Sequence, residues 1–297
     1  MTAIYNFLTV HRPAPQAMAA ALAEAIGVPV RGVDVADEDA GQPDDRNWDA
    51  PVLCTHRSVA GDLALSWDVS VSGAVAAAPS EAGAALRLAS RLGTTVLYPA
   101  QETAPSAYWA VGPDGALARA RLLEADEGDG DGPPCLVVDA VDAPMGQLPA
   151  ARVEVLAEAL RAERWETPVT DSFAAAADPD GEAPATGTVN RAREALLLWE
   201  RLVRRIDAGW LPDGRYPFEL YAEDLRTRDR LEELGAAAGP ERERLGSAVA
   251  ELDAVFRRGT DADSGALLGR LTGSGSAVAD RGWWWHRRPS KLPWDGG

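Results

Sequence analysis

The chain of 297 residues has few of the residue types and patterns that carry enzyme chemistry or fix a compartment. Its two cysteines, Cys54 and Cys135, could form one bridge but provide no disulfide framework. It has no apolar run of about 18 residues, so we expect no membrane span. The segment beginning at Met1 lacks the basic region, apolar run and cleavage site of a signal peptide. We therefore expect a soluble cytoplasmic protein.

Histidine is also scarce, with His11, His56 and His286 spread along the chain. The sequence has no serine nucleophile elbow, HExxH pair, CxxC pair or glycine-rich phosphate loop. Cys54 and His56 share one face of an expected strand, which suits either a nucleophile with its base, two metal ligands, or a sheet face with a buried thiol. We favour the buried thiol, and we expect no catalytic residue, metal site or cofactor.

Positive charge is missing from the first part of the chain. Residues 1–186 hold 28 acidic residues, 11 arginines and no lysine, whereas residues 187–297 hold 18 acidic and 18 basic residues. The whole formal net charge of −17 therefore lies in the first part. Binding to nucleic acid or anionic lipid requires a basic face, so this part favours a basic protein partner, or solubility alone.

The densest acidic run is Asp126, Glu127, Asp129 and Asp131, interleaved with glycines. With Glu127 as the first ligand the run resembles the start of a calcium loop, but the twelfth position is Val138, where a bidentate glutamate is needed. We interpret the run as the loop at the end of a hairpin. Its negative charge suits contact with a basic partner.

The pattern of apolar residues predicts an α+β fold for residues 1–166, with a mixed or antiparallel sheet and packed helices. The clearest signal is a hairpin of residues 52–56 and 63–72, in which Leu65, Trp67 and Val69 alternate with polar residues. The order of elements is not a regular βαβ alternation. The expected strands are residues 4–10, 28–35, 52–56, 63–72, 94–98, 107–111, 116–123 and 136–141, and the expected helices are residues 16–26, 80–92 and 151–165.

Residues 167–188 are rich in Ala, Pro, Asp and Gly and predict a linker. Beyond it, apolar residues at helical spacing predict a helical domain over residues 189–297. The expected helices are residues 189–208, 218–234, 240–258 and 264–271, with a further one beginning near residue 277.

The C-terminal segment holds four of the ten tryptophans, among them Trp283, Trp284 and Trp285, followed by Arg287 and Arg288. Each tryptophan can bury about 200 Å², so this segment is expected to dock rather than stay in water. It could pack on its own chain, anchor a protein partner, or stack on single-stranded nucleic acid. The balanced charge of this part argues against nucleic acid.

Our leading hypothesis is a non-enzymatic protein-binding module whose acidic domain meets a basic protein. A concrete version is an immunity protein that neutralises a cationic toxin such as a nuclease, because complementary charge speeds association. One alternative is an enzyme that works with Asp62, Asp68, Glu124 and Arg121, which lie near expected strand ends. Another is a scaffold or regulatory subunit that binds through the tryptophan-rich segment.

Overall fold

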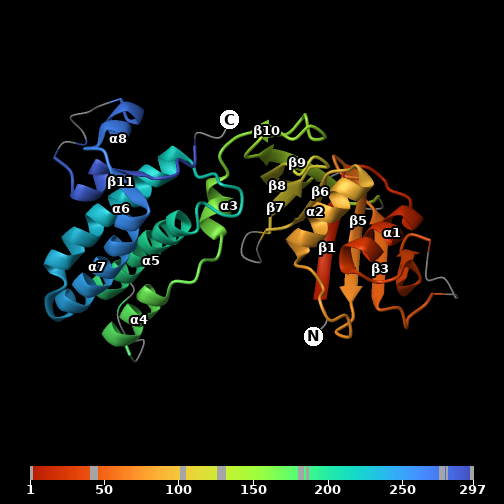
Figure 1. The fold of residues 1–297 in the computed structure, drawn as a ribbon, viewed down its shortest axis with the longest axis horizontal. Coiled ribbons are helices and arrows are strands. Elements are labelled where there is room, and N and C mark those ends of the chain that lie inside the picture. Colours follow the sequence, from red (N-terminus) through yellow and green to blue (C-terminus); the bar gives the residue numbers. More distant parts are fainter. Residues whose placement is uncertain are drawn as a thin grey trace. The chain divides into compact units, whose positions relative to one another are not determined.

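Figure 1 shows the computed structural model, which describes residues 3–40, 46–100, 105–125, 132–179, 184, 187–273, 278 and 280–294. The chain folds as two compact units, Met1–Glu163 (unit 1) and Arg164–Gly297 (unit 2). In its described part unit 1 contains a ten-stranded mixed sheet with packed helices, and unit 2 is mainly helical. The α+β class predicted from the sequence is therefore confirmed. None of the described helices combines the length and apolarity that crossing a membrane requires.

Unit 1 begins with a strand, a helix and a parallel return strand, and continues with mainly antiparallel strands. Its elements are β1 (Ala3–Thr9), α1 (Pro15–Ile26), the 3-10 turn η1 (Val30–Gly32), β2 (Val33–Asp37), β3 (Val52–Ser58), β4 (Ala60–Gly61), β5 (Leu65–Val71), α2 (Glu81–Leu92), β6 (Val96–Pro99), β7 (Ala107–Val111), β8 (Leu117–Ala125), β9 (Cys135–Val141), β10 (Arg152–Val153) and α3 (Ala157–Ala162).

The predicted hairpin is present as β3 and β5, paired antiparallel with His56 opposite Trp67. Along β5, Leu65, Trp67 and Val69 are buried while the serines and Asp68 between them are not. The buried side chains face α1 and α2, which lie side by side on this face of the sheet (Figure 1). Removing about 200 Å² of the Trp67 indole from water contributes about 5 kcal/mol at about 25 cal/mol per Å².

The strands of unit 1 close on themselves. After β3 the chain passes Val59 and enters β4, which pairs in parallel with β9. The hydrogen-bonded order runs β3–β5–β1–β6–β7–β8–β9–β4, and the chain itself joins β4 to β3 through Val59. We call this circuit the strand ring. Gly61 makes the closure possible, because it has φ of 89° and no side chain to collide with the Leu136 carbonyl.

A second core lies inside the strand ring, on the sheet face opposite α1 and α2. Three of its members are alanines, whose small side chains suit the interior of a narrow ring. The core residues are Leu8, Val59, Leu63, Leu97, Ala110, Ala118, Ala120, Leu122, Val138, Val141, Met145 and Leu148. β2 lies outside the ring at one edge of the sheet, and among the described strands it pairs only with β3, in parallel.

Unit 2 consists of helices with a small two-stranded sheet. Its long helices carry apolar residues at helical spacing, as predicted, and Trp199 of α5 packs on Phe256 of α7 with ring centroids 4.9 Å apart. The elements are α4 (Pro168–Ala177), α5 (Thr188–Asp207), α6 (Phe218–Ala237), the 3-10 turn η2 (Gly239–Glu241), α7 (Arg242–Arg258), β11 (Thr260–Ala262), α8 (Ala266–Leu271), the 3-10 turn η3 (Trp283–His286) and β12 (Arg287–Pro289).

Helix α4 occupies the first half of the segment predicted to be a linker, residues 167–188. Its N-terminus is held by Glu200 of α5, which is fully buried and accepts hydrogen bonds from the backbone N–H groups of Val169 and Thr170 at 3.2 and 2.8 Å. A carboxylate at a helix N-terminus satisfies the unpaired N–H groups and the positive end of the helix dipole. The linker prediction is therefore corrected over residues 168–177, where this distant contact outweighs the local composition.

Two other segments differ from the sequence-based prediction. Residues 151–165 were expected to be one helix, but β10 extends the sheet beside β9 and only α3 is helical. Residues 28–35 were expected to be one strand, but η1 precedes β2 there. At β10, pairing at a sheet edge replaces a weak local preference for helix.

We predict that Glu200→Ala lowers the stability of unit 2 by about 3 kcal/mol, because it leaves buried helix N–H groups without an acceptor. Chemical denaturation measures the loss, and hydrogen exchange over 168–177 should increase at the same time. Glu194→Ala on the exposed face of the same helix is the control and should change stability by less than about 0.5 kcal/mol. An equal loss in the two variants would contradict the assigned role of Glu200.

Candidate functional site

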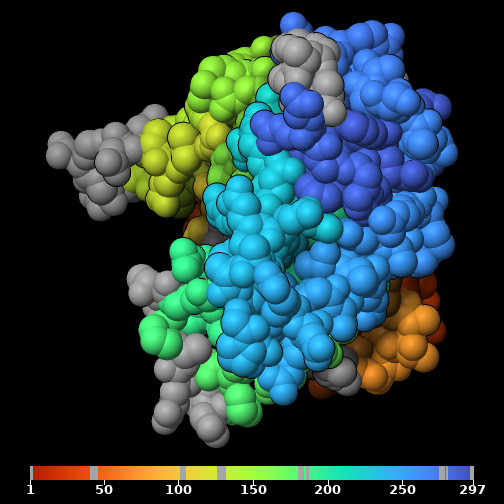
Figure 2. All heavy atoms as spheres, turned by 90° about the vertical axis from the view of Figure 1, so that its left-hand side faces the viewer, coloured from red at the N-terminus to blue at the C-terminus, as the bar shows by residue number. Residues whose placement is uncertain are grey.

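The tryptophan-rich segment packs on unit 2. β12 pairs antiparallel with β11, and Trp284 and Trp285 are only 4% and 3% exposed. Both indole N–H groups donate to Oδ1 of Asp229 on α6, at 3.0 and 2.9 Å. Figure 2 shows this segment in dark blue against α6 in cyan. The structure therefore has the first of the three arrangements considered for this segment, in which it packs on its own chain.

Arginines cover the faces of the three consecutive indoles. The guanidinium carbons of Arg257, Arg228 and Arg281 lie 3.7, 4.1 and 4.8 Å from the ring centroids of Trp283, Trp284 and Trp285, respectively. A guanidinium over an indole contributes about 0.5–2 kcal/mol, more when water is excluded. These contacts cover one face of each of the three indoles with an arginine of the same chain.

The two arginines that follow the tryptophans differ in their contacts and exposure. Arg287 donates from Nε to Thr260 Oγ1 at 2.8 Å and from Nη2 to the Arg257 carbonyl at 3.0 Å. Arg288 is 42% exposed and lies 3.7 Å from Asp261. Binding of a partner by Trp283, Trp284, Trp285, Arg287 and Arg288 stays a prediction, and in the described arrangement Trp284 and Trp285 have little surface to offer.

The acidic residues Asp126, Glu127, Asp129 and Asp131 lie outside the described residues. Elsewhere in unit 1 many carboxylates are neutralised by arginines. Arg121 donates to Glu154, Asp139 and Glu158 at 2.5–2.9 Å. These hydrogen bonds, that of Glu154 first, raise the pKa of Arg121, and the Arg152 and Arg121 guanidinium groups lower the pKa of Asp139.

Carboxylates at the end of the edge strand β2 are not neutralised in this way. Asp37, Glu38 and Asp39 are exposed there, and we call them the acidic edge. Asp37 lies 3.8 Å from the His56 ring, and Asp39 accepts the Ser58 backbone N–H at 2.8 Å. The Ser58 hydrogen bond lowers the pKa of Asp39, so this group stays charged near neutral pH.

An exposed tryptophan belongs to the segment that joins β2 to β3. Trp48 is 58% exposed, and the guanidinium of Arg46 lies 4.5 Å from its ring centroid. Arg46 is itself fixed by Asp34 on β2 at 3.0 Å and by Thr55 on β3 at 3.2 Å. The indole is thus held on a rigid support beside the edge strand. In the sequence the one available signal for this feature is a tryptophan within an Asp-rich segment.

Cys54 and His56 lie on one buried sheet face, as the strand alternation predicted. Burial raises the pKa of the Cys54 thiol, which disfavours the thiolate that nucleophilic or metal chemistry needs. The His56 ring packs on Trp67 with centroids 4.8 Å apart, and neither of its nitrogens hydrogen-bonds to another described residue. Among the residues that the structure describes, no group of three or more His, Cys, Asp or Glu could hold a metal ion.

The four residues of the enzyme alternative do not form one group. Asp68 and Glu124 line the same hollow inside the strand ring. Asp62 instead accepts the Val138 backbone N–H at 2.8 Å, and Arg121 belongs to the ion-pair network described above. The structure therefore brings together two of the four.

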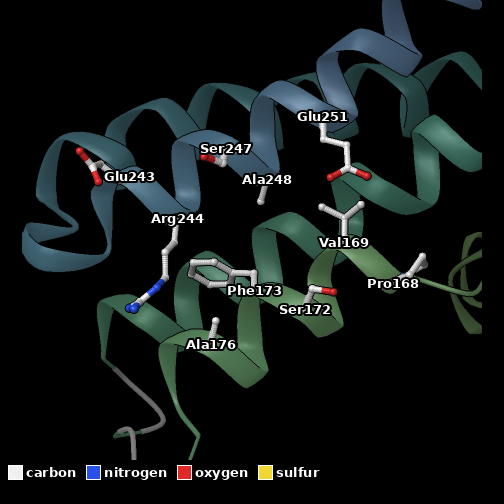
Figure 3. Close-up of a pocket in the computed structure, with 10 residues that line it drawn as sticks. All are labelled: Pro168, Val169, Ser172, Phe173, Ala176, Glu243, Arg244, Ser247, Ala248 and Glu251. Atoms are coloured by element: carbon white, nitrogen blue, oxygen red, sulfur yellow. The ribbon is translucent and has the colours of Figure 1, made fainter.

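Unit 2 has a groove of about 550 Å³ between α4 and α7 (Figure 3). Val169 and Phe173 of α4 face Ala248 of α7, and Arg244 and Glu251 stand toward opposite ends. The lining suits an apolar segment with charged ends. The groove could not be predicted from the sequence, because residues 168–177 were expected to be linker and not helix.

No protein-family model matches the chain, and no curated protein or solved structure is similar to it. A fold by itself does not define a function, so the functional argument rests on the surface chemistry of the two units.

We predict that Asp229→Ala destabilises unit 2 by about 2 kcal/mol, because two buried indole N–H groups and Arg281 lose their acceptor. The fluorescence of the segment's tryptophans should shift to longer wavelength as water reaches them. Glu233→Ala, on an exposed position of the same helix, is the control and should leave both readings unchanged. Unchanged stability in Asp229→Ala would show that the segment docks without this carboxylate.

Proposed function

We propose that the chain is a protein-binding module whose unit 1 binds a cationic protein through the acidic edge and Trp48. The observation that carries the proposal is the uncompensated negative charge of unit 1. This unit holds 23 acidic residues and 10 arginines, a formal net charge of −13. A field of this sign raises the rate of encounter with a basic protein and repels nucleic acid and anionic lipid.

Several arginines of unit 1 bind carboxylates of the same unit, which supports the proposal. Arg119 is buried between Glu163 and Asp142, and Arg121 and Arg46 each bind carboxylates of neighbouring elements. These cations therefore cancel carboxylates inside the unit, and the excess is left for exposed groups such as the acidic edge. Exposed charges of this kind act mainly on the rate of association and are sensitive to salt.

Trp48 adds an apolar anchoring contact, which charge alone does not provide. Exposed tryptophans are frequent anchors of protein interfaces, because one rigid side chain covers a large area. The Arg46 support reduces the freedom that Trp48 would lose on binding. The acidic edge would thus set the rate of association, and the Trp48 indole would set the rate of dissociation.

The specific form of this proposal is an immunity protein that masks a cationic toxin, such as a nuclease, in the cytoplasm. Such a partner needs a basic active-site face to bind nucleic acid, and a strongly acidic surface complements that face.

We predict that unit 1 in the full chain binds a basic probe protein, cytochrome c, and not its succinylated form, whose lysines carry carboxylates. Affinity should fall more than about tenfold between about 50 and about 500 mM salt. Asp37→Asn with Glu38→Gln should slow association at least about threefold, whereas Trp48→Ala should mainly speed dissociation. Surface plasmon resonance separates the two rates.

The matched control is Glu194→Gln with Glu233→Gln, which removes two exposed charges from unit 2. This pair should leave association unchanged within about twofold. A salt-independent affinity, or an equal effect of the control pair, would overturn the proposal that the acidic edge binds the partner.

A further inference from the structure

The strand ring of unit 1 has a hollow of about 480 Å³ on its inner side. This volume lies within the range of about 300–1,000 Å³ typical of sites for small ligands. Its apolar lining comes from Leu8, Val59, Leu122 and Leu136 together with Pro99 and Pro134. The small residues Ala110, Ala118 and Ala120 fill the ring beside it.

Polar side chains reach the hollow from five strands of the ring. The register puts Asn6 of β1 opposite Asp68 of β5, on the face that points away from α1 and α2. Tyr108 of β7 and Glu124 of β8 belong to the other wall, and Arg57 stands on β3. The hollow therefore has one guanidinium and two carboxylates over an apolar floor.

These groups have no partner within the part of unit 1 that the structure describes. The side chains of Asn6, Arg57, Asp68, Tyr108 and Glu124 make no hydrogen bond or ion pair there. Arg57 and Asp68 lie diagonally across adjacent strands, because the register places Arg57 opposite Ser66 and Asp68 opposite Thr55. Opposite charges are thus held near each other without being joined, in contrast to the paired arginines elsewhere in unit 1.

Tyr108 adds a neutral donor to this set. Burial, and secondly the negative charge of Glu81, raise the pKa of its hydroxyl, so the group stays protonated over the physiological range. Together with the Asn6 amide it can donate a hydrogen bond to an anionic oxygen or accept one from an ammonium.

We propose that this hollow binds a small zwitterion with an apolar body, the chemistry of a free α-amino acid or a dipeptide. Arg57 binds the carboxylate, Asp68 and Glu124 bind the ammonium, and Leu8, Leu122 and Leu136 contact the hydrocarbon. Such a ligand satisfies both signs of charge at once, which a simple cation or anion does not. The site is separate from the acidic edge, and the inference does not depend on the proposed protein partner.

The test is isothermal titration calorimetry of the full chain with L-leucine and with leucyl-leucine, which differ in the separation of their charged ends. L-Leucinamide lacks the carboxylate, and N-acetyl-L-leucine lacks the ammonium. We expect one of the two zwitterions to bind, and its amide and N-acetyl analogues to bind at least about tenfold more weakly. The zwitterion that binds more tightly shows whether the site takes a free amino acid or a dipeptide.

Two variants assign the charged ends. Arg57→Gln should remove the preference for the zwitterion over the amide and leave the preference over the N-acetyl compound. Asp68→Asn should have the opposite pattern. Both positions are exposed and without partners in the described residues, so the variants should fold normally, and circular dichroism checks this.

Arg31→Gln and Asp49→Asn, exposed positions of unit 1 that do not line the hollow, are the matched controls and should bind like the unchanged chain. The inference is overturned if neither zwitterion binds, if the amide or the N-acetyl compound binds equally well, or if both hollow variants keep full affinity. Because Asp37 and Glu38 lie outside the hollow, failure here leaves the cytochrome c result unaffected.

Discussion

The parallel pairing of β4 with β9 is the contact on which most of unit 1 depends. Without it the sheet would be open and the apolar side chains around Leu8 and Leu122 would face water. With it those side chains form a second core, distinct from the one beneath α1 and α2. The closure also shapes the hollow, so this proposed binding site follows from one short pairing.

Unit 2 is held together by carboxylates that accept hydrogen bonds from distant elements. Its helices are rich in alanine, and three of its carboxylates fix elements that are distant in sequence. Glu200 holds the start of α4, Asp229 holds the tryptophans of η3, and Asp253 of α7 accepts two hydrogen bonds from Arg228 of α6 at 2.9 and 2.8 Å. A buried carboxylate is costly unless its oxygens are satisfied, and each of these has donors. The arrangement gives unique contacts where small side chains alone would allow sliding.

The strongest local patterns predicted the structure well. The alternation around Trp67 predicted β5 and its pairing with β3, and the predicted helices 16–26 and 80–92 are present as α1 and α2. The expectation that the C-terminal tryptophans dock was also sound, because the area of four indoles leaves few alternatives. These predictions depend on signals carried within about 20 residues.

The remaining features depend on long-range contacts, which periodicity does not report. β4 is two residues long, so Ala60 and Gly61 show no pattern that would reveal their pairing. From the sequence, Glu200 would be expected on the polar face of α5; it is buried because the N-terminus of α4 packs on it. The acidic run predicted to bind a partner lies outside the described residues, and no local pattern singled out the acidic edge or the hollow. The placement of Arg57 and Asp68 on one sheet face follows from strand register. Register is set by the whole sheet.

The ring closure has a consequence for the order in which the chain gains structure. The hydrogen bond from Val138 to Asp62 at the closure joins residues 76 positions apart, whereas most helix contacts of unit 2 are between neighbouring elements. Long-range contacts carry the largest entropy of loop closure and form slowly. During synthesis the closure must therefore wait for β9 to emerge, and the hollow is among the last parts of unit 1 to take shape.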